Sequence, residues 1–158
     1  MSGCAAKRGA APVAQIADLS EVEAAAVIYL RLWCEGPESQ SRVWTDFVNA
    51  LGPERGRNAL KSFEHLFGLC VEHRRRPMMR HSVNCACVGS DEACFCNFIL
   101  TAIEGDREEA LMIATLLVRA DLAPALTSLA MEYGLALKTM FQACPVTAGT
   151  APQGKTVH

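Results

Sequence analysis

The sequence contains no uninterrupted apolar run of the roughly eighteen residues that a membrane-spanning helix needs. Residues 1–17 carry Lys7 and Arg8 but no apolar stretch after them, so they do not look like a secretory signal. The sequence therefore predicts a protein without a membrane span. We expect it in the cytoplasm, where thiols stay reduced.

Several motifs that mark enzymes are missing from the chain. There is no G-x-S-x-G, no P-loop and no G-x-G-x-x-G, and the H-x-E with a later C-x-x-C of the zinc deaminases does not occur. The formal net charge of -2 argues mildly against a protein that coats nucleic acid, because such proteins are usually basic. We therefore expect a role other than catalysis.

The composition is that of a globular domain. Hydrophobic residues make up 51% of the 158 residues and charged residues 20%, which is enough to bury one core. Apolar residues recur at helical spacing and no alternating pattern predicts a strand. We predict an all-α single domain of about six helices over residues 18–145, with a flexible arm at 1–17 and a flexible tail at 146–158.

Caps and breakers set the expected helix boundaries. Ser20 and Glu23 form a capping box before the first helix, and Gly36-Pro37 follows its end. The expected helices cover about 20–34, 39–51, 54–75, 90–104, the segment after Asp106 and the segment after Asp121. Their apolar faces predict one shared core, built from Trp33, Trp44, Phe47, Leu60, Phe63, Phe67, Phe95, Ile99, Leu126, Leu129 and Tyr133.

Cysteine is the residue type that the chain has in excess. Four of its eight cysteines fall within residues 81–96 as two C-x-C pairs, in and after an irregular loop between the third and fourth helices. Zinc is usually held by four thiolates and imidazoles. The sequence therefore predicts a metal site, most simply zinc, with ligands drawn from Cys85, Cys87, Cys94, His81 and Cys96.

The fourth ligand stays open between His81 and Cys96. Two positions two residues apart in a helix are about 200° apart around its axis, so Cys94 and Cys96 cannot both face one ion if the helix is regular. Cys96 shares a face with Ile99, which predicts that it points to the core. Cys34 and Cys70 are also expected to serve as small buried side chains. Cys70 is at the same time a candidate for an additional metal ligand, as is His73.

Two other uses of the same sulfurs compete with zinc. An iron–sulfur cluster also takes four thiolates, but the spacing matches none of the common ferredoxin patterns. A thiol redox sensor needs an accessible thiolate with a lowered pKa, and Cys94 near a helix N-terminus is the candidate that the sequence favours.

A basic cluster suggests a further alternative. Arg74, Arg75, Arg76 and Arg80 could contact the phosphates of DNA, although the acidic balance of the chain disfavours it. Taken together, we expect a metal-binding helical protein that acts as a regulator or adaptor through a protein partner or self-association. A thiol or iron–sulfur redox sensor and a DNA-binding regulator are the alternatives.

Overall fold

Six α-helices account for most of residues 8–74 and 77–143, the part of the chain that the computed structural model describes. The all-α class predicted from the sequence is confirmed. The helices are α2 (Glu21–Glu35), α3 (Pro37–Leu51), α4 (Pro53–Glu72), α5 (Ser90–Glu104), α6 (Arg107–Leu117) and α7 (Ala123–Ala143). Two short 3-10 turns, Ile16–Asp18 and Ala120–Leu122, precede α2 and α7.

Local capping explains where the helices begin. The Ser20 hydroxyl accepts from the backbone N–H of Glu23 at 3.3 Å, while the Glu23 carboxylate accepts from the Ser20 N–H at 3.1 Å. This capping box satisfies two N–H groups that a helix start leaves without partners. Asp106 caps α6 by accepting from Glu109 N–H at 3.0 Å. The predicted boundaries agree with these caps within a few residues.

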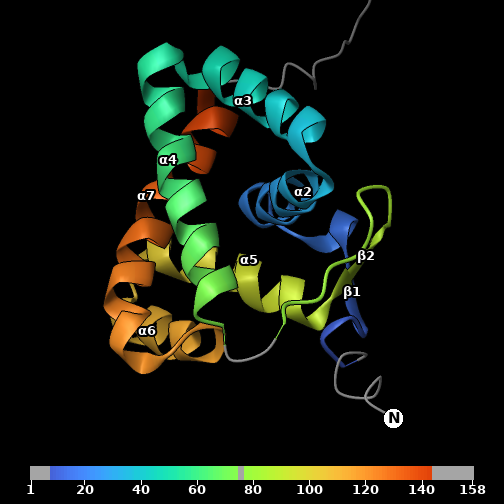
Figure 1. Cartoon of the computed structure of the whole chain (residues 1–158), viewed down its shortest axis with the longest axis vertical. Helices are drawn as coiled ribbons and strands as arrows, with labels where there is room; N and C mark the ends of the chain where they lie inside the picture. The colour runs from blue at the N-terminus through green and yellow to red at the C-terminus, as the bar shows by residue number, and fades with distance from the viewer. Residues whose placement is uncertain (1–7, 75–76, 144–158) are drawn as a thin grey trace, which may run out of the picture.

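The core lies where α7 meets α2, α4 and α5 (Figure 1). Phe63 of α4 stacks on Tyr133 of α7 with ring centroids 4.8 Å apart, and meets Trp33 of α2 edge-on at 5.3 Å. Gly134 lets α7 approach α5 closely, because a Cβ there would collide with Ile103. All eleven predicted core residues belong to this cluster, with Trp44, Phe67 and Leu129 only partly buried at its edge.

Two short strands join the N-terminal end of the described chain to its middle. Strand β1 (Pro12–Gln15) pairs antiparallel with β2 (Cys87–Gly89), and the Ile16 N–H extends the pairing to the Ala86 carbonyl at 2.8 Å. In Figure 1 the blue β1 lies beside the yellow-green β2. Residues 12–15 thus form a strand within the segment where the sequence predicts a flexible arm and no strand.

The other terminal predictions fall outside the described residues. The tail expected at 146–158 and residues 1–7 of the arm lie outside the described residues, together with Cys4 and Cys144. Within 8–74 and 77–143, no helix is both long enough and apolar enough to cross a membrane.

Candidate functional site

Residues 81–89, which we call the cysteine loop, run from His81 to the start of α5 and lie against both β1 and the end of α2. The loop contains Cys85 and β2 begins at Cys87. Just before it, the N–H of Met79 donates to the Asp91 carboxylate at 2.7 Å. The segment that leads into the loop is therefore tied to the first turn of α5.

A buried arginine fixes the loop from inside. Arg31 of α2 is fully buried, and its guanidinium forms a two-pronged ion pair with Glu92 of α5, Nε to Oε2 at 2.6 Å and Nη2 to Oε1 at 2.8 Å. It also donates to the carbonyls of Cys85 at 2.8 Å and Cys87 at 2.7 Å. One side chain therefore holds the backbone on both sides of Ala86.

Glu92 completes this arrangement. Its carboxylate accepts from the N–H of Gly89 at 3.0 Å and from the N–H of His81 at 3.2 Å. Burial opposes ionisation of this carboxyl, but the hydrogen bonds from Arg31, Gly89 and His81 outweigh it and lower the pKa of Glu92 below its ordinary value. The ion pair is thus also the anchor for both ends of the cysteine loop.

His81 and Cys85 form a hydrogen-bonded pair within the loop. The Nδ1 atom of His81 lies 3.4 Å from the Cys85 sulfur, and its Nε2 atom lies 2.7 Å from the carbonyl oxygen of Ala10. A carbonyl oxygen only accepts, so Nε2 carries the hydrogen that donates to Ala10. In the neutral ring Nδ1 is then the acceptor that faces the Cys85 thiol.

This geometry favours a charged pair. The pKa of Cys85 is lowered by the backbone N–H of Cys87 and then by His81, while the pKa of His81 is raised by its bond to Ala10 and by Cys85. A thiolate stabilised in this way is the nucleophilic form of cysteine. Cys85 is half-buried.

Cys87 lies beside this pair. Its side chain also helps to lower the pKa of Cys85, and its sulfur accepts from the side chain of Gln15 on β1 at 3.6 Å. None of the six described cysteines forms a disulfide. The loop thus holds two reduced thiols next to one imidazole.

The remaining predicted ligands lie elsewhere. Cys96 is buried in the core, as helical geometry predicts, and its thiol donates to the carbonyl of Ala93 at 3.4 Å. Cys94 lines a different cavity, which Cys70 and Asp91 share. Within the described ranges, no three or more His, Cys, Asp or Glu side chains are grouped so that they could hold a metal ion. The zinc site predicted from the sequence therefore stays a prediction.

Three thiols on the helices have a raised pKa, in contrast to the lowered pKa of Cys85. Burial raises the pKa of Cys70 and of Cys96 to about 12 in each case, and it also raises the pKa of Cys34. These thiols stay protonated at neutral pH and act as small apolar side chains. The sequence favours Cys94 as the reactive thiol. Among Cys34, Cys70, Cys85 and Cys96 in the structure, Cys85 is the one whose pKa is lowered.

The basic cluster is only partly described. Arg75 and Arg76 lie outside the described residues, while Arg74 and Arg80 line a cavity between α2, α4 and α5. His73, considered above as an additional ligand, ends α4 and lies 3.8 Å from the Glu72 carboxylate.

Arg31 is the functional residue that the sequence analysis missed. A charged side chain between Leu30 and Leu32, inside the otherwise apolar run from Ala24 to Trp33, was the available signal. Lone charges are rarely buried without a partner, so such a position predicts a buried ion pair.

The chain shows no significant similarity to known proteins: it matches no protein-family model, no curated protein and no solved structure.

Proposed function

We propose that this protein is a thiol-based redox regulator whose reactive centre is Cys85, activated by His81 and paired with Cys87. The observation that carries the proposal is the 3.4 Å contact between the Cys85 sulfur and His81 Nδ1, with the opposite nitrogen held by Ala10. A nucleophile, a base and a third group that orients the base are the elements that activate cysteine in proteins. The zinc site predicted from the sequence is the second candidate.

The chemistry starts with a hydroperoxide. The Cys85 thiolate attacks the outer peroxide oxygen, the S–O bond forms and the O–O bond breaks, and the leaving oxygen takes the proton from the His81 imidazolium. Cys85 is then a sulfenic acid. The Cys87 sulfur attacks Cys85, the S–S bond forms and the S–O bond breaks, and the oxygen leaves as water with the Cys87 proton. Two thiols and one hydroperoxide thus give one disulfide, one alcohol and one water.

The disulfide would change the backbone that Arg31 and β1 contact. Residues two apart in a fully extended segment lie about 6.6 Å apart, and the bend at Ala86 keeps Cys85 and Cys87 within that span and within the roughly 6.8 Å limit for the Cα atoms of a disulfide. Closing the bridge draws Cys85 and Cys87 together. Arg31 holds the carbonyls of both residues, and Gln15 of β1 is the strand partner of Cys87. Oxidation therefore weakens the pairing of β1 with β2, and the affinity of a partner protein that binds residues 8–16 would change.

The test is oxidation with hydrogen peroxide followed by peptide mass spectrometry. Cys85 and Cys87 should form a disulfide before any other thiol is modified. In Cys87→Ser, dimedone should trap a sulfenic acid on Cys85, and Cys85→Ser should abolish both products. Cys34 is the matched control because it is also half-buried but its pKa is raised. Oxidation of Cys34 at the same rate as Cys85 contradicts the proposal.

Hydrogen exchange measures the structural consequence. The oxidised protein should exchange the Ile16 amide, which bonds to Ala86, faster than the reduced protein, while amides in α7 should not change. Equal exchange in both forms would contradict the proposal that oxidation weakens the β1–β2 pairing, while the oxidation of Cys85 itself would still stand.

The same preparation tests zinc. Reduced protein should be equilibrated with zinc, passed through gel filtration and analysed for metal. One equivalent retained by the native chain and lost in both Cys87→Ser and Cys94→Ser would support the predicted zinc site in place of the redox switch. Metal-free protein with the peroxide response described above supports the switch.

A further inference from the structure

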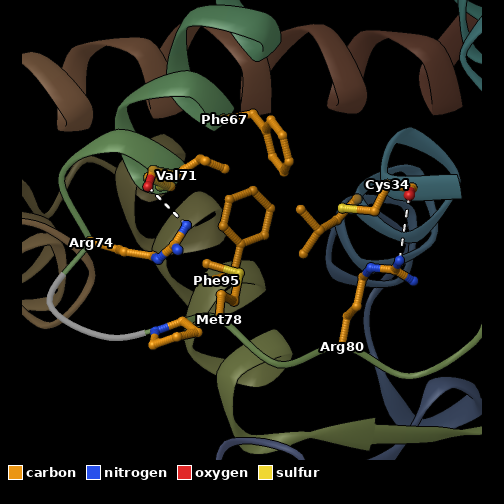
Figure 2. A pocket seen from close by; sticks show the side chains of 10 residues that line it. Cys34, Phe67, Val71, Arg74, Met78, Arg80 and Phe95 are labelled. Atoms are coloured by element: carbon orange, nitrogen blue, oxygen red, sulfur yellow. Dashed lines mark hydrogen bonds between the residues drawn. The ribbon is translucent and has the colours of Figure 1, made fainter. Parts of the chain in front are cut away.

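A second feature of the molecule is a cavity of about 200 Å³ between α2, α4, α5 and residues 77–80. Phe67 of α4 and Phe95 of α5 form its aromatic walls, with Leu30, Val71 and Met78 around them. Figure 2 shows the rings of Phe67 and Phe95 close together, with Arg74 and Arg80 on either side of them. The cavity thus combines an apolar interior with cationic edges.

The two arginines have capacity to bind an anion. Arg74 donates to the Val71 carbonyl at 2.9 Å and Arg80 to the Cys34 carbonyl at 3.4 Å. A guanidinium has five N–H donors, so each keeps several for a ligand. Within the described chain neither forms an ion pair with a carboxylate, and the described lining contains no Asp or Glu.

The thiols that line the cavity do not oppose an anion. Burial raises the pKa of Cys34 and raises the pKa of Cys70 to about 12, so both are neutral at physiological pH. Sulfur also packs well against aromatic rings, which suits an aryl ligand. Neither Cys85 nor Cys87 lines the cavity, so a ligand here does not require the redox chemistry.

We infer that this cavity binds a small aryl monocarboxylate, with its ring against Phe67 and Phe95 and its carboxylate on the guanidinium of Arg74 or Arg80. The volume suits one ring with a short side chain, because a dry cavity of about 150 Å³ takes up benzene. Guanidinium recognises carboxylates through paired hydrogen bonds, which supplies the polar end of the site. A few placed polar groups on an apolar lining are typical of small-molecule sites.

The experiment uses phenylpropanoate as the probe and phenylpropanol as its neutral counterpart. Both are titrated into the reduced chain while the methyl signals of Leu30, Val71 and Met78 are followed by NMR. The carboxylate should shift these methyls and bind at least about tenfold more tightly than the alcohol, because a hydrogen bond to a charged group is at stake.

Four variants locate the site. Arg74→Gln or Arg80→Gln should remove the preference for the carboxylate while the alcohol still binds, which also shows that the cavity is intact. Arg57→Gln, at an exposed position on α4 outside the cavity, should change nothing. Cys34→Met, which fills the cavity, should weaken both probes.

Three results would overturn the inference. The first is equal affinity for the acid and the alcohol, and the second is methyl shifts outside the cavity only. The third is the same loss of carboxylate binding in Arg57→Gln as in Arg74→Gln and Arg80→Gln. Because Cys85→Ser should bind phenylpropanoate like the native chain, this inference and the redox proposal can fail separately.

Discussion

The cysteine loop and the helical core hold the same side chain in opposite chemical states. In the loop, Cys85 receives hydrogen bonds from a backbone N–H and from His81, and its pKa is lowered. In the core, Cys70 and Cys96 lose contact with water, and burial raises their pKa to about 12. The comparison shows that the number of cysteines says little about their chemistry, because donors and water decide which thiol ionises.

The two regions also differ in what holds them together. Apolar side chains and stacked rings fix the core, whereas the loop is fixed by the Arg31–Glu92 pair and its bonds to backbone carbonyls. A polar anchor keeps thiols accessible, since covering the loop with apolar side chains would desolvate Cys85 and raise its pKa. The anchor is therefore part of what makes the loop thiol different.

Breaking the anchor should have the largest effect. Arg31→Met leaves Glu92 buried without its cation, and removing one partner of a buried pair costs about 3–5 kcal/mol of unfolding free energy. The free energy is measured by urea unfolding. Arg119→Met, which removes an exposed partner of Asp121, is the matched control and should cost less than about 1 kcal/mol. Equal costs for the two variants would show that Arg31 does not hold the loop.

The second prediction compares how much a core thiol and a loop thiol contribute to the stability of the fold. Cys70→Ser places a hydroxyl at a position that is 4% exposed, and burying a hydroxyl without a partner costs about 1–3 kcal/mol. Cys85→Ser keeps a group that can bond to His81 and water, so thermal unfolding should change little. If Cys85→Ser destabilised the protein as much as Cys70→Ser, the loop thiol would be a packing residue like the others.

These expectations show how far the sequence could lead. Ser20 with Glu23, Asp106 and the apolar periodicity predicted the helices, because capping and amphipathic patterns are local. Helical geometry also predicted that Cys96 faces the core, which the structure confirms. Local pattern is therefore enough for the class of the fold and for most of its core.

The features of the site that were missed are not local. Strand β1 is four residues long and its partner lies more than seventy residues later, from Pro12 to Gly89. Glu92 is paired with Arg31 across 61 positions of sequence. The activation of Cys85 depends on the carbonyl of Ala10, which no motif in the loop reveals. Such contacts follow from tertiary packing and leave no periodic signal.

The smallest effect sharpens the role of His81. His81→Gln removes the imidazole that lowers the pKa of Cys85, so less thiolate is present at neutral pH and alkylation by iodoacetamide slows, by roughly tenfold for each unit that the pKa rises. The curve of rate against pH should move to higher pH. His73→Gln, at the partly exposed end of α4, is the control and should leave the Cys85 rate unchanged. If the curve for His81→Gln is not shifted, His81 does not lower the pKa of Cys85.

One measurement tests the central claim directly. The native, reduced chain is treated with iodoacetamide from acid to alkaline pH, and modification of each cysteine is quantified by peptide mass spectrometry. Cys85 should react first, with a midpoint below the ordinary pKa of a thiol, while Cys70 and Cys96 stay unmodified until the protein unfolds. A midpoint for Cys85 at or above the ordinary value, or modification of Cys70 at the same pH, would contradict the account.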